Sequence, residues 1–252
     1  MLMRTLESAL NIKISFVIPT LNEEKTLEKT LRHISDYHGP HETIISDGGS
    51  TDRTLEIART YTDKIVQHPG AHAQTIARGR NEGASLATGD FIVEMDADSH
   101  FPNINKFFAA IIEVFKKNPS VVGATTWFRV YPGDETFLDR LIFKIAGAVT
   151  LIINNYLGLG CTCGGEFQMI RADAFRQIGG YNEKLVAMED VEMFSRLKKI
   201  GRIHFEKRLF IYHSGRRAHI LGWSNSIITF IFNCLFLLAF GEVRSSTWNI
   251  VR

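Results

Sequence analysis

Short apolar runs alternate with helix-forming segments along the first half of the chain. The apolar runs predict strands over Ile14–Ile18, Thr43–Ser46, Lys64–Gln67, Phe91–Met95 and Val121–Val130. The intervening segments predict helices over Glu23–Ile34, up to Thr60, over Gln74–Ala87 and over Asn103–Lys117. We expect Ser50 or Thr51 to cap the helix that ends at Thr60. The alternation predicts an α/β fold in which helices flank a mainly parallel, Rossmann-like sheet.

The pattern changes after about Thr136. A long apolar helix is predicted over Phe137–Leu157. Shorter elements follow, namely a strand over Glu166–Ile170, helices over Ala172–Gln177 and Asp190–Ile200, and a last strand over Arg202–Tyr212. Because no linker-like segment separates these elements, we expect one domain over residues 1–218 and an apolar helical extension over residues 219–252.

The extension contains an uncharged run, Ile227–Phe240, which is shorter than the roughly 20 residues of a spanning helix. It is either a helix buried in the domain core or a helix that lies on, re-enters or partly spans a membrane. Because this helix has apolar residues on every face, we favour its association with a membrane over burial in the core. Basic residues before the run suit anionic head groups, namely Arg202, Lys207, Arg208, Arg216 and Arg217. We expect the protein at the cytoplasmic face of the cell membrane, peripheral or partly inserted.

Composition narrows the classes of partner and compartment. The 252 residues include 29 basic and 27 acidic side chains, a net charge of +2, so we do not expect a nucleic-acid partner. Three cysteines cannot form a disulfide framework and favour a reducing compartment, so we interpret Cys161 and Cys163 as ordinary thiols. No apolar signal-peptide stretch follows the first twelve residues, which favours a cytosolic N-terminus.

Polar residues gather where predicted strands end. Pro19, Thr20, Asp47 and Asp96 all occupy such positions, and parallel strands bring these ends to one crevice. Asp96 and Asp98 form a carboxylate pair after a buried strand, a pattern that suits Mg²⁺ bound together with substrate phosphates. A solvated turn with two acidic residues is the alternative.

Five motifs in a fixed order carry a family resemblance. They are Val17–Glu24, Ser46–Thr54, Arg80–Gly83 with Thr88–Asp90, Asp96–Asp98, and Glu189–Asp190 with Val191–Met193. Together they resemble the family 2 glycosyltransferases of the GT-A fold over roughly Ile14–Ile200. In the second motif Ser46 replaces the first acidic residue of the family pattern, so Asp47 alone can serve there.

The resemblance implies an inverting, metal-dependent enzyme that uses a nucleotide diphosphate sugar. It places the donor against Pro19, Thr20, Glu23, Asp47, Arg80 and Asp96. It assigns a divalent cation, Mn²⁺ or Mg²⁺, to Asp98, Asp96 and His213. The cation would act as a Lewis acid on the leaving diphosphate.

An acceptor hydroxyl needs a general base, and Asp190 fits because the dipole at the start of its predicted helix should keep the carboxylate ionised. Glu189 is the alternative base. Arg129, Arg216 and Arg217 are candidates for holding a phosphate or an acceptor anion. The expected acceptor is a glycan or a lipid-linked molecule, and the sequence leaves the donor base, GDP or UDP, open.

Three other functions stay open. A polyprenyl- or dolichyl-phosphate sugar synthase would use a phosphate acceptor and need no base, but the Glu189–Asp190 motif favours a hydroxyl acceptor. A sugar-nucleotide pyrophosphorylase would need a glycine-rich loop, and Thr20–Glu24 contains no glycine. A non-catalytic carbohydrate or nucleotide binder would not need Asp98 and Asp190 together.

Overall fold

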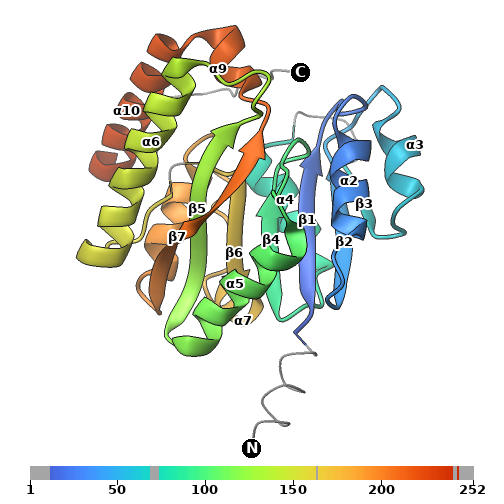
Figure 1. Ribbon diagram of the computed structural model, residues 1–252, viewed down its shortest axis with the longest axis horizontal. Coiled ribbons are helices and arrows are strands. Elements are labelled where there is room, and N and C mark those ends of the chain that lie inside the picture. The colour runs from blue at the N-terminus through green and yellow to red at the C-terminus, as the bar shows by residue number, and fades with distance from the viewer. Residues whose placement is uncertain (1–11, 69–73, 163, 241–242, 244–252) are drawn as a thin grey trace, which may run out of the picture.

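A seven-stranded sheet forms the centre of the computed structural model, which describes residues 12–68, 74–162, 164–240 and 243. The strand order is β3-β2-β1-β4-β6-β5-β7 (Figure 1). The strands are β1 (Ile14–Thr20), β2 (His41–Asp47), β3 (Ile65–Gln67), β4 (Phe91–Met95), β5 (Val121–Val130), β6 (Phe167–Arg171) and β7 (Arg202–His213). Strand β6 runs antiparallel to both of its neighbours, and the other pairs are parallel. The prediction of a mainly parallel sheet is therefore confirmed.

Helices cover both faces of this sheet. The chain adds α2 (Leu27–Ser35), α3 (Thr54–Arg59), α4 (Ile76–Ser85), α5 (Ile104–Lys117), α6 (Phe137–Leu151), the π-helix η1 (Ile152–Leu157), α7 (Ala172–Gln177), α8 (Glu189–Leu197), α9 (Arg216–Leu221) and α10 (Trp223–Phe240). Phe16 and Ile18 of β1 pack in one core cluster with residues of α2 and α5. Val17 between them packs in a second cluster with residues of α4, α7 and α8. Alternate residues of one strand thus fill the two cores.

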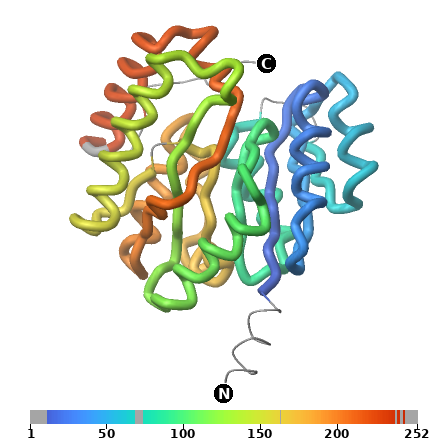
Figure 2. The backbone as a smooth tube through the Cα atoms, in the orientation of Figure 1, coloured from blue at the N-terminus to red at the C-terminus, as the bar shows by residue number. Residues whose placement is uncertain are grey.

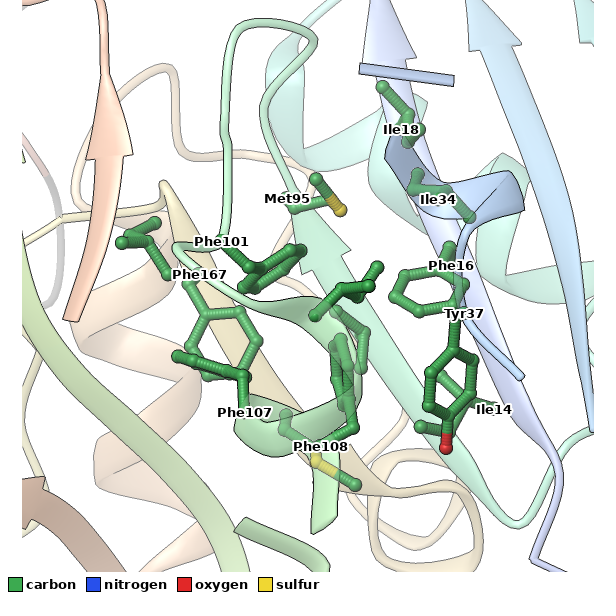
Figure 3. Close-up of a cluster of buried hydrophobic side chains, with 14 of the residues drawn as sticks. Ile14, Phe16, Ile18, Ile34, Tyr37, Met95, Phe101, Phe107, Phe108 and Phe167 are labelled. Carbon is green, nitrogen blue, oxygen red and sulfur yellow. The ribbon is translucent and has the colours of Figure 1, made fainter. Parts of the chain in front are cut away.

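The first core cluster is rich in aromatic rings. Phe101, Phe107, Phe108 and Phe167 lie together beside Phe16 (Figure 3). The Phe107 and Phe167 rings meet edge to face, with centroids 5.1 Å apart. This cluster joins α5 to strands β4 and β6, which fixes the strand that leads into Asp96.

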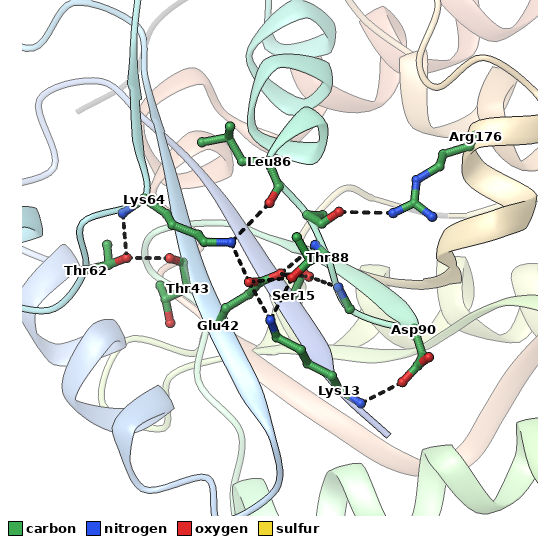
Figure 4. Close-up of polar contacts among 12 residues, drawn as sticks. Lys13, Ser15, Glu42, Thr43, Thr62, Lys64, Leu86, Thr88, Asp90 and Arg176 are labelled. Carbon is green, nitrogen blue, oxygen red and sulfur yellow. Dashed lines mark hydrogen bonds and ion pairs between the residues drawn. The ribbon is translucent and has the colours of Figure 1, made fainter. Parts of the chain in front are cut away.

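The amino ends of the strands are held by a polar network. Lys13 and Lys64 each place their ammonium group against Glu42, at 2.8 and 2.7 Å (Figure 4). Ser15 and Thr88 donate further hydrogen bonds to the same carboxylate. Partial burial raises the pKa of Glu42, but these donors lower it well below its ordinary value. The network lies at the edge of the sheet opposite Asp47 and Asp96, so it stabilises the fold.

Helix boundaries differ from the predictions at several places. Helix α2 begins at Leu27, after a turn that starts at Glu23. Helix α3 begins at Thr54 and neither Ser50 nor Thr51 caps it, because the carboxylate of Asp52 accepts the Thr54 N–H. The capping prediction was therefore wrong. The predicted long apolar helix exists, but its last six residues form the π-helix η1.

Helix α6 packs on β5 and β7, and the C-terminal helices α9 and α10 lie beside α6 (Figure 2). Asp139 of α6, fully buried, accepts hydrogen bonds from His219 Nε2 and Trp223 Nε1 at 2.8 and 2.7 Å. These contacts cross the predicted boundary at residue 219, which falls inside α9. Over residues 12–240, leaving aside the gaps at 69–73 and 163, every helix falls short of the length and apolarity that a membrane crossing requires.

Candidate functional site

Asp47 organises the loop that follows β2. Its position on β2 is opposite Thr20 of β1, whose hydroxyl donates to Asp47 at 3.1 Å. The backbone N–H groups of Gly49 and Ser50 donate to the other carboxylate oxygen at 3.0 and 2.9 Å. Ser50 Oγ donates as well, at 2.5 Å, and Asp47 is fully buried. These contacts shape the loop, and the predicted contact of Asp47 with a nucleotide base stays a prediction.

Glu23 and Arg216, predicted for separate roles, pair with each other. Two guanidinium nitrogens of Arg216 approach the two oxygens of Glu23 at 2.8 and 2.6 Å. Arg216 Nε also lies 3.5 Å from Asp98 Oδ2. The Glu23–Arg216 ion pair joins the loop after β1 to the start of α9. It places the positively charged guanidinium of Arg216 beside the Asp96–Asp98 carboxylates. Pro19, half-buried and opposite Ser46 in the sheet, lies on the same edge.

The Asp96–Asp98 pair follows β4, as predicted. Asp98 accepts a hydrogen bond from Ser214 Oγ, and its backbone carbonyl accepts one from Tyr131. Partial burial raises the pKa of Asp96; Arg80 opposes the rise, and the carboxylate of Asp98 adds to it. A carboxylate whose pKa is raised by a neighbouring carboxylate, as that of Asp96 is by Asp98, would gain from a bound cation.

His213 lies at the end of β7, against these carboxylates. Burial lowers its pKa to about 4, so the imidazole is neutral near pH 7, and Asp98 opposes the shift. Its buried Nε2 has no hydrogen-bond partner among the described residues. In that same part of the chain, no three His, Cys, Asp or Glu side chains are grouped closely enough to hold a metal. Two carboxylates and a neutral imidazole with an unpartnered nitrogen have the chemistry of ligands for a divalent cation that also binds substrate oxygens and water, and their assembly around one cation stays a prediction.

Arg80 connects this carboxylate pair to Glu189 at the start of α8. Its guanidinium is almost fully buried and donates to Glu189 Oε1 at 3.0 Å. A second nitrogen lies 3.5 Å from Asp96 Oδ1 and donates to the Gly165 carbonyl at 3.1 Å. Although burial lowers the pKa of Arg80, Tyr181 and the surrounding carboxylates raise it above its ordinary value. Arg80 is therefore a buried, permanently charged side chain that contacts both Asp96 and Glu189.

Burial, and not the helix dipole, is the largest influence on the pKa values of the two candidate bases, Glu189 and Asp190. Met188 adopts a left-handed conformation, φ 61°, and α8 starts directly after it with Glu189 and Asp190. Burial raises the pKa of Glu189 to about 7, and Asp190 adds to the rise against Arg80. Burial also raises the pKa of Asp190. For Asp190 the effect of burial on the pKa exceeds the opposite effect of the backbone hydrogen bonds at the start of α8, and the predicted ionised state stays a prediction.

The pattern of loops and acids agrees with the comparison with known families. The model of "Glycosyl transferase family 2" matches residues 15–179. This chain belongs to that family.

Relatives of this family-2 chain include the "probable glycosyltransferase YdaM" of Bacillus subtilis. The two are 26% identical over 207 residues, which are 75% of this chain and 47% of YdaM. The chain spans about half the length of the curated relatives that it matches first, 47% and 54%.

Two solved structures share the fold. One is the mannosyltransferase PcManGT of Pyrobaculum calidifontis with GDP-Man and Mn²⁺, at a TM-score of 0.64, 18% identity, and coverage of 80% of this chain and 56% of that one. The other is the glucosyl-3-phosphoglycerate synthase of Mycobacterium tuberculosis with Mn²⁺ and UDP-Glc. Its TM-score is 0.64 and its identity 20%, and the match covers 96% of this chain and 84% of that one. The predicted GT-A fold is thereby confirmed.

Glu166 is a site residue that sequence reasoning missed in this family-2 chain. Its Oε1 lies 4.0 Å from His213 Nδ1. Burial raises the pKa of Glu166 to about 8, and Asp96, Asp190 and Asp98 add to the rise. The available signal was the Gly164–Gly165 pair before it, which permits a close approach of the backbone to the site.

The remaining predicted anion contacts are Arg129 and Arg217. Arg129 pairs with Glu135 at 3.0 Å, and its guanidinium lies over the rings of Phe210 and Tyr212. Arg217 is half-buried in the first turn of α9. Their roles toward an acceptor anion stay predictions. Cys161 is a free thiol, and Cys163 lies outside the described residues.

Proposed function

We propose that this protein transfers a sugar from a GDP- or UDP-sugar to an acceptor hydroxyl, with inversion of the anomeric configuration. One observation carries the proposal: Arg80 contacts both Asp96 and Glu189, so the candidate cation ligands and the candidate base belong to one site. Such a site offers a place for the leaving diphosphate on one side and for proton removal on the other.

On the donor side, Asp96, Asp98 and His213 would hold a divalent cation, which when bound supplies Lewis-acid stabilisation of the leaving diphosphate. Arg216 lies next to Asp98 and adds positive charge there. Glu23 orients that guanidinium by its two-point contact. The chain's own contribution is thus a fixed cluster of charges at the place where the leaving group becomes more negative.

On the acceptor side, Asp190 is the proposed general base and Glu189 the alternative. The raised pKa of each carboxylate makes it a stronger base than an exposed one. The basic form exists above the raised pKa, so the transfer rate should increase with pH through that value and then level off. A phosphate acceptor, as in a polyprenyl-phosphate sugar synthase, would not need this proton transfer.

The test is an assay of nucleoside diphosphate release from GDP-mannose and UDP-glucose with Mn²⁺. Asp190→Asn should retain donor binding and lose about 10²–10⁴-fold in transfer, the usual size of a general-base contribution. The sugar product, followed by nuclear magnetic resonance, should have the inverted configuration. A product of retained configuration would rule out single displacement.

We further propose that the C-terminal face of the protein lies on the cytoplasmic face of the cell membrane. Large apolar side chains that are half exposed or more lie on α6, η1, α9, α10 and the second residue after η1. They are Phe137, Ile145, Tyr156, Leu157, Leu159, Ile220, Ile228, Ile231, Leu235 and Phe240. Patches of this extent mark interaction surfaces in soluble proteins. Lys144, exposed on α6, could meet anionic head groups. A membrane-bound enzyme of this kind would suit a lipid-linked acceptor or a growing glycan.

A further inference from the structure

One oxygen of the Glu166 carboxylate lacks a hydrogen-bond partner. Its Oε2 is buried without a partner among the described residues, and Oε1 is 4.0 Å from His213 Nδ1, which is beyond hydrogen-bond distance. The backbone N–H of Glu166 itself bonds to the carboxylate, so the unused hydrogen-bonding capacity is that of Oε2. A carboxylate can accept several hydrogen bonds, so this one has unused capacity inside the site.

The backbone nevertheless holds Glu166 in place. Ser99 Oγ donates to the Glu166 carbonyl at 3.0 Å, and Arg80 donates to the carbonyl of Gly165 at 3.1 Å. A Cβ at Gly164 would lie 2.0 Å from Glu166 Oε2, so the carboxylate occupies space that any other residue at position 164 would fill. The Gly164–Gly165–Glu166 segment is therefore packed to present this side chain at a fixed position.

That position adjoins both halves of the site. His213 lies 4.0 Å from the Glu166 carboxylate, and Arg80, which contacts Asp96 and Glu189, donates to the carbonyl of the neighbouring Gly165. In a direct displacement the sugar must lie between the leaving diphosphate and the base, which is this same space. A diphosphate oxygen would be repelled by the neighbouring carboxylates, whereas neutral hydroxyl groups can donate to them.

We propose that Glu166 binds a hydroxyl group of the donor sugar and so contributes to the selection of the sugar. The inference rests on the proposed function, because it needs a nucleotide sugar in the site. Removing a polar partner from a buried hydrogen bond weakens binding on the order of 10–100-fold. If Glu166 contacts only the sugar, the nucleoside diphosphate alone should bind without this loss.

The experiment measures binding of GDP, GDP-mannose, UDP and UDP-glucose by calorimetry, each with Mn²⁺. Glu166→Ala should weaken the nucleotide sugar by about 10–100-fold and the matching nucleoside diphosphate by less than about twofold. Glu166→Gln keeps the shape and part of the hydrogen-bonding capacity, so it should recover part of the loss. Glu56→Ala, an exposed glutamate of α3 that pairs with Arg53, is the matched control and should change neither affinity.

The outcomes distinguish a failure of the sugar-binding role of Glu166 from a failure of the proposed function. Equal weakening of the sugar and the diphosphate ligands by both Glu166 variants would make Glu166 a cation or diphosphate residue and overturn the inference alone. Unchanged affinity for all ligands would overturn it too. Failure of the unmodified protein to bind any of the four would overturn the proposed function and this inference with it. If the alanine variant does not fold, as judged by thermal unfolding, the glutamine variant decides by the same comparison.

Discussion

Replacing Arg80 by methionine removes the buried cation that several carboxylates share. Methionine has a similar length and no charge, so packing changes less than electrostatics. Glu189 would lose a hydrogen bond of 3.0 Å, the Gly165 carbonyl one of 3.1 Å, and Asp96 its contact at 3.5 Å. Glu94, fully buried with both carboxylate oxygens unpartnered among the described residues, would lose the attraction of the same guanidinium.

The expected loss of unfolding free energy is about 3–5 kcal/mol near neutral pH, the usual effect of removing one partner from a buried ion pair. The size of the loss should depend on pH. Burial raises the pKa of Glu189 to about 7 and that of Glu94 to about 8 while Arg80 opposes both shifts, so in the variant both should rise further. A carboxyl group whose folded pKa is raised destabilises the folded state above its unfolded pKa. The loss should therefore shrink from pH 8 toward pH 5, where these groups are protonated.

Urea denaturation of Arg80→Met at pH 5, 6, 7 and 8 measures this dependence. Arg78→Met is the control, because Arg78 lies on the same helix and pairs at the surface with Glu82 at 2.7 Å, half exposed. An exposed pair of this kind contributes less than about 1 kcal/mol at any of these pH values. A loss for Arg80→Met no larger than that of the control, or one that does not change with pH, would refute the account of Arg80 as the shared buried cation.

Three further predictions address the cation, the fold and the membrane. Asp98→Ala should abolish Mn²⁺-dependent binding of a nucleoside diphosphate in calorimetry while the protein stays folded, and binding that is insensitive to a chelator would contradict the assigned cation site. Glu42→Gln should cost about 1.5–3 kcal/mol of stability at pH 7, the range for hydrogen bonds to charged groups. Because the folded pKa of Glu42 is lowered, the difference from the unmodified protein should begin to shrink as the pH falls below the unfolded value of about 4.5 and should vanish only toward the lowered folded pKa, which acid titration of stability would check. Ile145→Glu combined with Ile231→Glu should abolish flotation with anionic lipid vesicles, whereas vesicle binding by the double variant equal to that of the unmodified protein would exclude this face as the membrane contact.

The sequence by itself determined the elements and the loops that carry the chemistry. Strand-forming runs such as Ile14–Ile18 and Phe91–Met95 are apolar because both of their faces are covered, a local property that the residue pattern records. Asp47 and Asp96 follow such runs, and parallel strands necessarily bring their carboxyl ends to one edge. Fold class, family and the approximate place of the site therefore needed no coordinates.

Only the tertiary structure decided which side chains meet and how burial changes their chemistry. Arg80 reaches Glu189 across 109 positions of sequence, and Glu23 pairs with Arg216 across 193, and no local pattern encodes such distances. The pKa of Asp190 is set by the surroundings that exclude water from it, not by its place at a helix start. Glu166 belongs to the site because Gly164 and Gly165 let the chain pass close to Arg80 and fold the carboxylate back. Pairing, burial and close approach arise from packing of distant segments, so they become visible only in three dimensions.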